Sequence, residues 1–316
     1  GILCPELLLK GSDPITFHVP LDGVLEWSTA EDSGRLLANV CEADVPDEFW
    51  NRFYNISSGP SFRLTNYEFE AKLLKAIGCP PVEKIFEPNW FAIRNLHGQW
   101  YTDSDVLEGY LHFRSNQTCD SYFAWMAKQV PWYFHLAKIV PSSLIKWGMG
   151  RIASTPGLGT RDWIKKRNEN RIAAYFGSFE AWQSIPEWND LMKKRPSEKP
   201  TLLNHGYDES KPLSALTIED MRQAAEFRGG KCLSSSMTEG DMATPLEWEC
   251  QFGHRFKASP ALILQGGHWC PECLPMPWND DAIAKGNPFF AQVYYPFHSK
   301  EEHRVYDNSI FADYNE

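Results

Sequence analysis

The sequence lacks a long hydrophobic run. Its most apolar stretch is interrupted at Lys128, Pro131, Lys138, Pro141 and Lys146. A membrane-spanning helix needs roughly 18 consecutive apolar residues, and no stretch of the chain reaches that length. The sequence therefore predicts no transmembrane segment.

Cysteine is also scarce, with eight residues in a chain of 316. Four of them are scattered without the close spacing of the disulfide frameworks found in small secreted domains. We expect these four to be reduced core residues, and the protein to occupy a reducing compartment, the cytoplasm. They are Cys4, Cys41, Cys79 and Cys119.

Basic charge is in deficit, because 31 Lys and Arg stand against 41 Asp and Glu, for a formal net charge of −10. This balance argues against a protein whose overall task is to coat nucleic acid or an anionic membrane. Aromatic side chains, in contrast, are abundant at 14%. They predict a sizeable core, with aromatic surface left over for a ligand or a partner.

Strand and helix patterns alternate in the first third of the chain. Residues 14–27 contain two short strand-like runs, and residues 53–56 form a third. The capping-box patterns Ser28–Glu31 and Thr65–Glu68 each predict the start of a helix. Such an alternation is typical of the α/β class.

Residues 121–195 are aromatic and predicted to be helical, with local breaks at Pro131, Pro141 and the glycine-rich stretch 148–159. Between residues 138 and 195, eleven basic residues stand against five acidic ones. We interpret this excess as a solvated helix face. The alternative is a docking face for an acidic partner or a phosphate.

Two close pairs of metal-binding residue types stand in the last third of the chain. Cys250-Gln-Phe-Gly-His254 is followed by Cys270-Pro-Glu-Cys273. Tetrahedral zinc favours such pairs, because each lies on a tight turn and the segment between them lets the second pair complete the tetrahedron. The predicted ligands are Cys250, His254, Cys270 and Cys273. Four protein ligands leave no position for water or substrate, so one structural zinc ion per chain is expected.

The residues around these ligands follow the pattern Trp-x-Cys-x-x-Gly-His-x-Phe, then Trp-Cys-Pro-x-Cys, and resemble a treble-clef or zinc-ribbon module over residues 218–274. The resemblance implies that Trp248, Phe256 and Trp269 pack around the metal. Modules of this type often accompany nucleic-acid-processing proteins. Residues 218–273 hold five basic and eight acidic side chains, however, so they cannot neutralise phosphates, and nucleic acid is not expected as a partner.

Three segments of the first third carry further motifs. They are Val24–Arg35, Phe53-Tyr-Asn-Ile-Ser-Ser-Gly59 and Tyr101–Leu107. In this order they resemble the C-terminal substrate lobe of an extended short-chain dehydrogenase/reductase of the NAD-dependent epimerase/dehydratase type, over residues 1–116. The resemblance implies a partial Rossmann-like α/β fold and NAD(P)-dependent epimerisation, dehydration or reduction of a small-molecule substrate.

The chemistry of that family depends on two motifs. Both are missing from the residues that carry the resemblance. One is the glycine-rich turn after a first strand, where the pyrophosphate of the dinucleotide approaches the backbone. The other is Tyr-x-x-x-Lys, in which the lysine lowers the pKa of the tyrosine for proton transfer. The resemblance thus implies that a missing N-terminal half binds NAD(P), and that this chain alone has no catalytic residue and is inactive.

Candidate substrate contacts are the polar residues Arg63, His97 and Asp103, which stand near turns where the family lines its pocket; ordinary surface or capping roles remain open for each. The alternative for the whole chain is a non-enzymatic, zinc-containing scaffold that docks a protein partner. The expected parts are an α/β substrate lobe, an aromatic helical extension, a zinc-binding module and an aromatic tail. They span residues 1–120, 121–200, 201–278 and 279–316.

Overall fold

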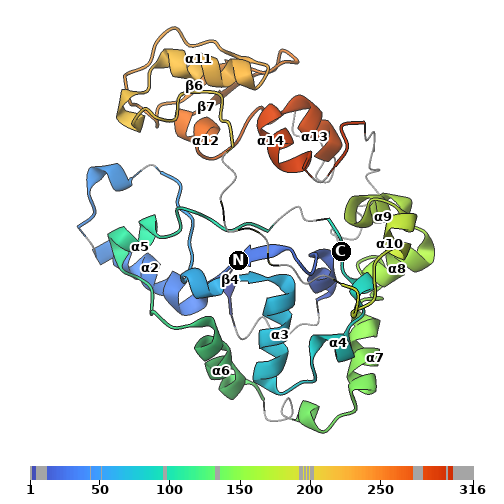
Figure 1. Cartoon of the computed structure of the whole chain (residues 1–316). Helices are drawn as coiled ribbons and strands as arrows, with labels where there is room; N and C mark the ends of the chain where they lie inside the picture. Colours follow the sequence, from blue (N-terminus) through green and yellow to red (C-terminus); the bar gives the residue numbers. More distant parts are fainter. Residues whose placement is uncertain are drawn as a thin grey trace. The chain divides into compact units, whose positions relative to one another are not determined.

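A computed structural model of the chain divides into two compact units (Figure 1). Unit 1 takes the described residues of 1–45 and 54–198, and unit 2 takes those of 46–53 and 199–308. The described residues are 2–4, 13–42, 44–50, 52–94, 98–131, 136–191, 195, 197, 199, 203–272, 280–296 and 298–301.

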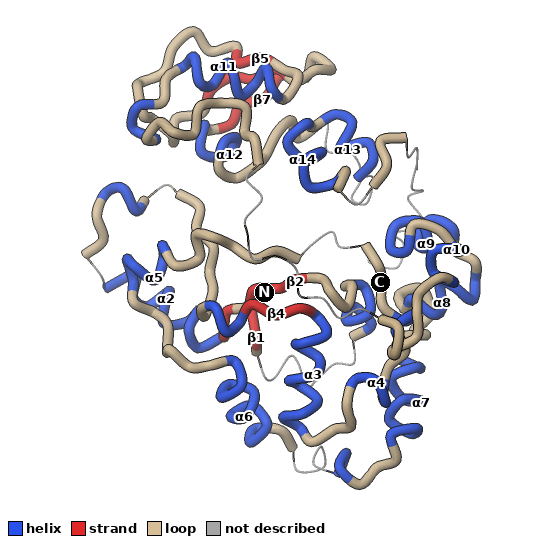
Figure 2. Tube along the Cα trace, in the orientation of Figure 1, coloured by secondary structure: helices blue, strands red, loops and turns tan. Residues whose placement is uncertain are grey.

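Unit 1 contains two small strand ladders among its helices (Figure 2). Strand β1 (Ile2–Leu3) pairs in parallel with β3 (Ser28–Thr29). Strand β2 (Val24–Glu26) pairs antiparallel with β4 (Arg63–Thr65). This mixture of helices and strands confirms the coarse α/β prediction. Within the part of the chain that the structure describes, parallel pairing is limited to the β1–β3 ladder.

Two predicted strands are wrong. Residues Pro14–His18 form a 3₁₀ helix, η1, because the Asp13 carboxylate accepts a hydrogen bond from the Ile15 amide at 2.9 Å and proline suits the first turn. Residues 53–56 are irregular. The turn that follows them is attached instead through Ser58, whose amide donates to Trp27 O at 3.0 Å and whose hydroxyl accepts from the Thr29 amide at 2.8 Å.

The two capping boxes differ in outcome. Helix α2 (Ala30–Glu42) is capped by Thr29 rather than Ser28, since the Thr29 hydroxyl accepts from the Asp32 amide at 3.1 Å. The box at the start of helix α3 (Asn66–Ile77) is confirmed, with reciprocal hydrogen bonds between Thr65 and Glu68 at 3.2 and 2.8 Å. Helix α3 ends at Gly78, whose φ of +77° favours glycine.

The predicted helical stretch after residue 120 is confirmed, and so are the breaks at Pro131 and Pro141. The break predicted at 148–159 is shorter than expected, because the helix that starts at Ser142 continues through Gly148 and Gly150 to Ile152. Its helices are α6 (Cys119–Gln129), α7 (Ser142–Ile152), α8 (Thr160–Lys166), α9 (Glu169–Phe176) and α10 (Phe179–Gln183). Shorter elements precede it in unit 1. They are η3 (Pro60–Phe62), α4 (Val82–Ile85), η4 (Pro88–Trp90) and α5 (Val106–Leu111).

Two aromatic clusters form the core of unit 1. Cluster A gathers Phe62, Tyr122 and Phe123, and cluster B gathers Phe17, Phe86, Trp90 and Phe91, with ring centres 5.2–6.3 Å apart within each. Helix α3 belongs to both, through Phe69 in cluster A and Leu74 in cluster B. The abundance of aromatic residues in the sequence is therefore largely core.

Unit 2 is built on a three-stranded antiparallel sheet in the order β5-β6-β7. Its strands are β5 (Lys231–Cys232), β6 (Leu246–Glu249) and β7 (Arg255–Ala258). Trp248 and Ile263 are fully buried in its core, beside Met221 of helix α11. The helical elements are η2 (Asp47–Phe49), η6 (Leu213–Ala215), α11 (Ile218–Phe227), α12 (Pro260–Leu264), α13 (Asp280–Gly286) and α14 (Pro288–Tyr294).

Residues 46–53 belong to unit 2 although the chain on either side of them belongs to unit 1. Glu48, Trp50 and Arg52 line one hollow together with Leu213 and Met242. Unit 2 is therefore assembled from two separate stretches of the sequence.

The four single cysteines carry free thiols, but their burial differs. Cys119 is buried, and Cys4 and Cys79 are partly buried. Cys41 is exposed on the outer side of α2, so its predicted core position is wrong. Among the helices described, none is both long enough and apolar enough to cross a membrane.

The carboxyl of Glu70 in α3 gives the stability of unit 1 a pH dependence. It is 5% exposed, and its one hydrogen bond in the described structure, from the Thr16 hydroxyl, is long at 3.5 Å. Burial raises its pKa to about 7, because the charged form loses its hydration. A raised acid pKa gives stability that is present at low pH and lost as the pH rises through about 7.

We expect Glu70→Gln to flatten this dependence. Between about pH 5 and about pH 8 the wild-type chain should lose on the order of 1–3 kcal/mol of unfolding free energy that the variant retains, measured by urea unfolding. Glu42→Gln, at an exposed position of α2, is the matched control and should behave as wild type. Identical profiles for wild type and Glu70→Gln would contradict the prediction.

Candidate functional site

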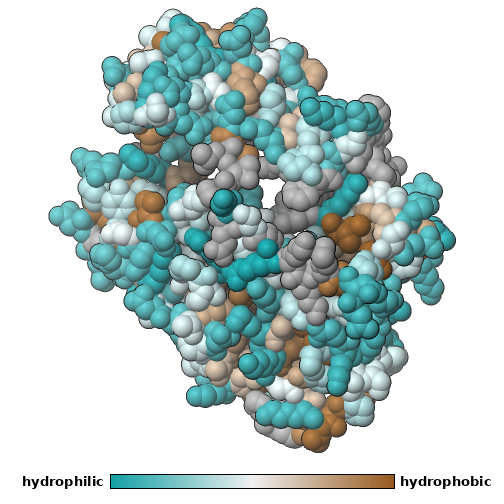
Figure 3. Space-filling view, viewed as in Figure 1, coloured by the Kyte–Doolittle hydropathy of each residue, from teal (hydrophilic) through white to brown (hydrophobic). Residues whose placement is uncertain are grey.

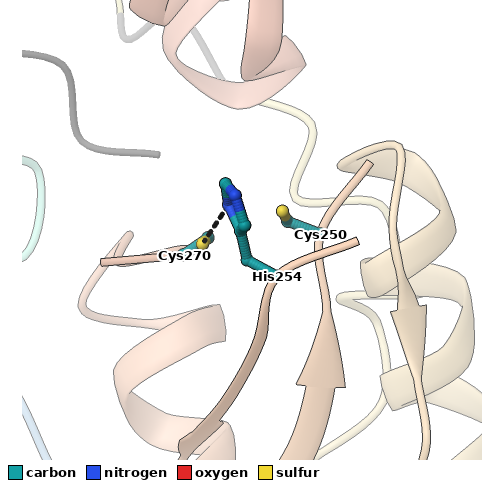
Figure 4. Close-up of side chains that lie close together, drawn as sticks. All are labelled: Cys250, His254 and Cys270. Carbon is teal, nitrogen blue, oxygen red and sulfur yellow. Dashed lines mark hydrogen bonds between the residues drawn. The ribbon is translucent and has the colours of Figure 1, made fainter. Parts of the chain in front are cut away.

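Three of the four predicted metal ligands meet in unit 2 (Figure 4). The ligand atoms of Cys250, His254 and Cys270 all lie within 4.8 Å of one another. Cys270 Sγ is 3.7 Å from His254 Nδ1. Two ligands of a tetrahedral zinc ion are about 3.3–3.8 Å apart, so the spacing suits such an ion. The fourth predicted ligand, Cys273, lies outside the described residues.

The first ligand pair lies on the turn between β6 and β7. The Cys250 amide donates to His254 O at 3.0 Å, and the Gly253 amide donates to Cys250 O at 2.9 Å. Gly253 has a φ of +84°, which a residue with a side chain adopts only at a cost. This tight turn brings the Cys250 thiol and the His254 ring to the same side of the hairpin, as Figure 4 shows.

The third ligand arrives after helix α12. The chain leaves the helix through Gly267, with a φ of +68°, and the His268 amide donates to Leu262 O at 3.1 Å. Cys270 then faces the first pair and is 2% exposed, while Cys250 is 3% exposed. Burial keeps water away from both sulfur atoms, which favours a lasting thiolate–metal bond over exchange.

The aromatic residues that the resemblance places around the metal pack against one another. The Trp269 ring meets Trp248 edge-on with centres 6.0 Å apart, and Phe256 at 5.2 Å. Trp248 Nε1 donates to Ala258 O at 2.9 Å, which ties β6 to the end of β7. Cys232 packs partly buried against this cluster, as a neighbour rather than a member of the ligand group.

In unit 1, Arg63 is held by a carboxylate that sequence reasoning missed. Glu26 is 3% exposed and accepts from the Tyr101 amide and the Ser104 hydroxyl, both at 2.7 Å. Arg63 Nε lies 3.3 Å from Glu26 Oε2, and Arg63 Nη2 donates to Tyr101 O at 2.6 Å. An acidic residue at the end of a predicted strand was the available signal, because a charge that becomes buried there needs a partner.

The other two candidate substrate contacts are less informative. Asp103 is exposed and accepts from Asn55 Nδ2 at 2.9 Å, so it joins residues 53–59 to residues 101–107. Arg63 contacts the 101–107 segment, to which Asp103 belongs. The Arg63 side chain, however, is paired with the buried Glu26. His97 lies outside the described residues.

A Tyr-x-x-x-Lys spacing does occur once, at Tyr207 and Lys211 in unit 2. The two residues lie in turns rather than on a helix. Burial raises the pKa of Tyr207, and Lys211 is paired with Asp220 at 2.6 Å. A raised tyrosine pKa is the opposite of what proton transfer needs, so this pair does not supply the family's catalytic motif.

From residue 161 onward, basic side chains of the predicted docking face make contacts within unit 1. Lys166 pairs with Asp162 at 3.0 Å, and Arg195 pairs with Glu68 at 3.4 Å. The guanidinium of Arg167 lies 3.4 Å from the centre of the Phe179 ring. For residues 166–195, these contacts favour the interpretation of a solvated face with local pairing.

Comparisons of this chain with protein-family models, with curated proteins and with solved structures find no match.

The ion pair of Arg63 and Glu26 makes a prediction about stability. Arg63→Met should lower the unfolding free energy by about 2–3 kcal/mol, because it leaves the buried Glu26 carboxylate without its cation. Arg63 itself is partly exposed, so the expected loss is smaller than for a fully buried ion pair. Arg63→Lys, which keeps the charge, should lose less. Urea unfolding of both variants provides the measurement, and a loss below about 0.5 kcal/mol for Arg63→Met would contradict it.

Proposed function

We propose that unit 1 is the substrate lobe of an NAD(P)-dependent epimerase, dehydratase or reductase, and that unit 2 is a module with a structural zinc ion. The observation that carries the first part is the meeting of the three resembling segments. Residues 24–35, 53–59 and 101–107 are far apart in the sequence, yet hydrogen bonds join each to another.

The hydrogen bonds between these segments can hold the residues that line a binding site in fixed positions. Glu26 fixes the 101–104 turn through two hydrogen bonds, and Ser58 fixes the 53–59 turn to the start of α2. Arg114 adds a third joint, donating through Nε to Ser57 O at 2.8 Å and through Nη2 to Ser104 O at 2.7 Å. A small-molecule site needs such support, because a loosely held wall loses the geometry that positions the substrate.

In this proposal, NAD(P) and the reacting residues belong to a nucleotide-binding half outside this chain. We expect titration of NAD or NADP into the 316-residue chain to give no saturable heat of binding. The same titration into the chain joined to its nucleotide-binding half should give saturable binding. Saturable binding by this chain alone would overturn this part of the proposal, and a joined protein without dehydrogenase or epimerase activity would overturn the enzyme assignment.

The zinc assignment rests on the donor set as well as the spacing. Two thiolates and one imidazole are soft to borderline ligands that zinc prefers over magnesium or calcium. We propose Cys273 as the fourth ligand, which would close the site and give the ion a folding role. The residues of this chain then do no chemistry at the metal.

One zinc per chain should copurify, as measured by elemental analysis. Cys270→Ser should lose the metal and unfold the module around β6, β7 and α12, because metal binding and folding are coupled in such sites. Cys41→Ser is the matched control, since Cys41 is exposed and remote from the ligand group in the sequence, and it should retain zinc. A preparation of native protein that contains no zinc would contradict the assignment.

The scaffold alternative relies on basic residues 138–195 as a docking face for an acidic protein. The contacts of Lys166, Arg167 and Arg195 within unit 1 remove part of that support. We therefore keep the substrate lobe as the proposed function.

A further inference from the structure

Helix α7 has hydrophobic side chains on two faces. Ile145, Met149 and Ile152 pack against core cluster B. On the outer side, Leu144 and Trp147 are 55% and 61% exposed. A surface helix of a soluble domain is ordinarily polar on its outer face, so a second apolar face marks a surface that meets something other than water.

The exposed apolar surface extends into the segment that leads into α7. Leu136 is 42% exposed and Ile139 is 78% exposed. Figure 3 shows hydrophobic surface at the lower end of unit 1, where this segment lies. We call these four residues the α7 patch: Leu136, Ile139, Leu144 and Trp147.

The stretch of sequence that carries the α7 patch has charged side chains of one sign. Residues 121–161 contain no Asp or Glu in a chain whose net charge is −10. The same 41 residues contain five basic side chains. They are Lys128, Lys138, Lys146, Arg151 and Arg161.

A hollow of about 480 Å³ opens beside Trp147. Its lining includes Lys146, Arg151 and Arg161, together with Ser143 and Ser154.

The guanidinium of Arg151 lies 5.4 Å from the centre of the Trp147 ring, and that of Arg161 lies 5.1 Å from the Trp90 ring. Lys146 is paired with Glu87, an acidic side chain from another part of unit 1. Three cations against one carboxylate suit a phosphate group.

We propose that the α7 patch docks the protein on a membrane surface that contains anionic phospholipid. Exposed leucine, isoleucine and tryptophan beside cations are the composition of interfacial segments, in which the apolar side chains enter the boundary of headgroups and acyl chains. The hollow beside Trp147 receives a lipid phosphate. A free phosphate would account for the hollow but not for the four exposed apolar side chains.

The acidic net charge does not oppose this contact. Charges farther from the membrane than about 10 Å are largely screened at 0.1 M salt, whereas basic side chains at the surface are attracted directly to anionic headgroups. The interaction is therefore local, and it should weaken as salt increases.

Vesicle flotation with the full chain tests the proposal. The chain should float with phosphatidylcholine vesicles that contain about one third phosphatidylserine, and not with phosphatidylcholine alone. Leu144→Ser combined with Trp147→Ser should reduce the bound fraction about tenfold, and Arg151→Glu should also reduce it. Leu37→Ser is the matched control, since Leu37 is 65% exposed on α2, and it should float as wild type.

Circular dichroism of each variant confirms that it is folded before flotation. Millimolar inorganic phosphate should leave flotation largely intact; complete release would assign the hollow to a free anion and overturn the membrane proposal. Failure to float, equal flotation with both vesicle types, or unchanged flotation of the double variant would overturn it as well. Concentration-dependent dimerisation that the double variant abolishes would instead assign the patch to a second copy of the chain.

Discussion

The buried carboxylate of Glu26 is the constraint on which the arrangement of unit 1 depends. A charge that is 3% exposed is costly unless hydrogen bonds and an opposite charge replace its water. Strand β2 carries it, β4 supplies Arg63, and the 101–104 turn supplies an amide and a hydroxyl. The partners come from two other parts of the chain, so satisfying one carboxylate fixes the positions of β2, β4 and the 101–104 turn relative to one another. Hydrophobic clusters A and B add stability but specify position less sharply, since apolar contacts have no direction.

Unit 2 depends on a different constraint, the small size of its sheet. Its strands are two to four residues long, and a sheet of that size buries little surface by itself. The Cys250, His254 and Cys270 group lies at the end of the β6–β7 hairpin, where a metal ion would join the hairpin to the chain that follows α12. Trp248, Phe256 and Trp269 lie beside it, so the small core and the proposed metal centre reinforce one another.

Features set by neighbouring residues could be predicted from the sequence. The box of Thr65 and Glu68, the end of α3 at Gly78 and the first ligand pair each depend on residues within one or two turns of backbone. Features set by distant residues could not. Glu26 and Ser104 are 78 positions apart, and no local pattern reports their contact. Residues 53–56 have strand-forming side chains, but the structure gives them no ladder partner among the described residues, and strand propensity depends on that context.

The excursion of residues 46–53 into unit 2 has a consequence for synthesis on the ribosome. These residues emerge about 150 positions before the rest of their unit, at a synthesis rate of roughly 5–20 residues per second. Phe49, which is 6% exposed in the finished fold, therefore remains without its final surroundings for roughly ten seconds or more. When the rest of unit 2 is synthesised, residues 46–53 are already connected on both sides to chain that belongs to unit 1. The folding of unit 2 therefore depends on a segment that was synthesised together with unit 1.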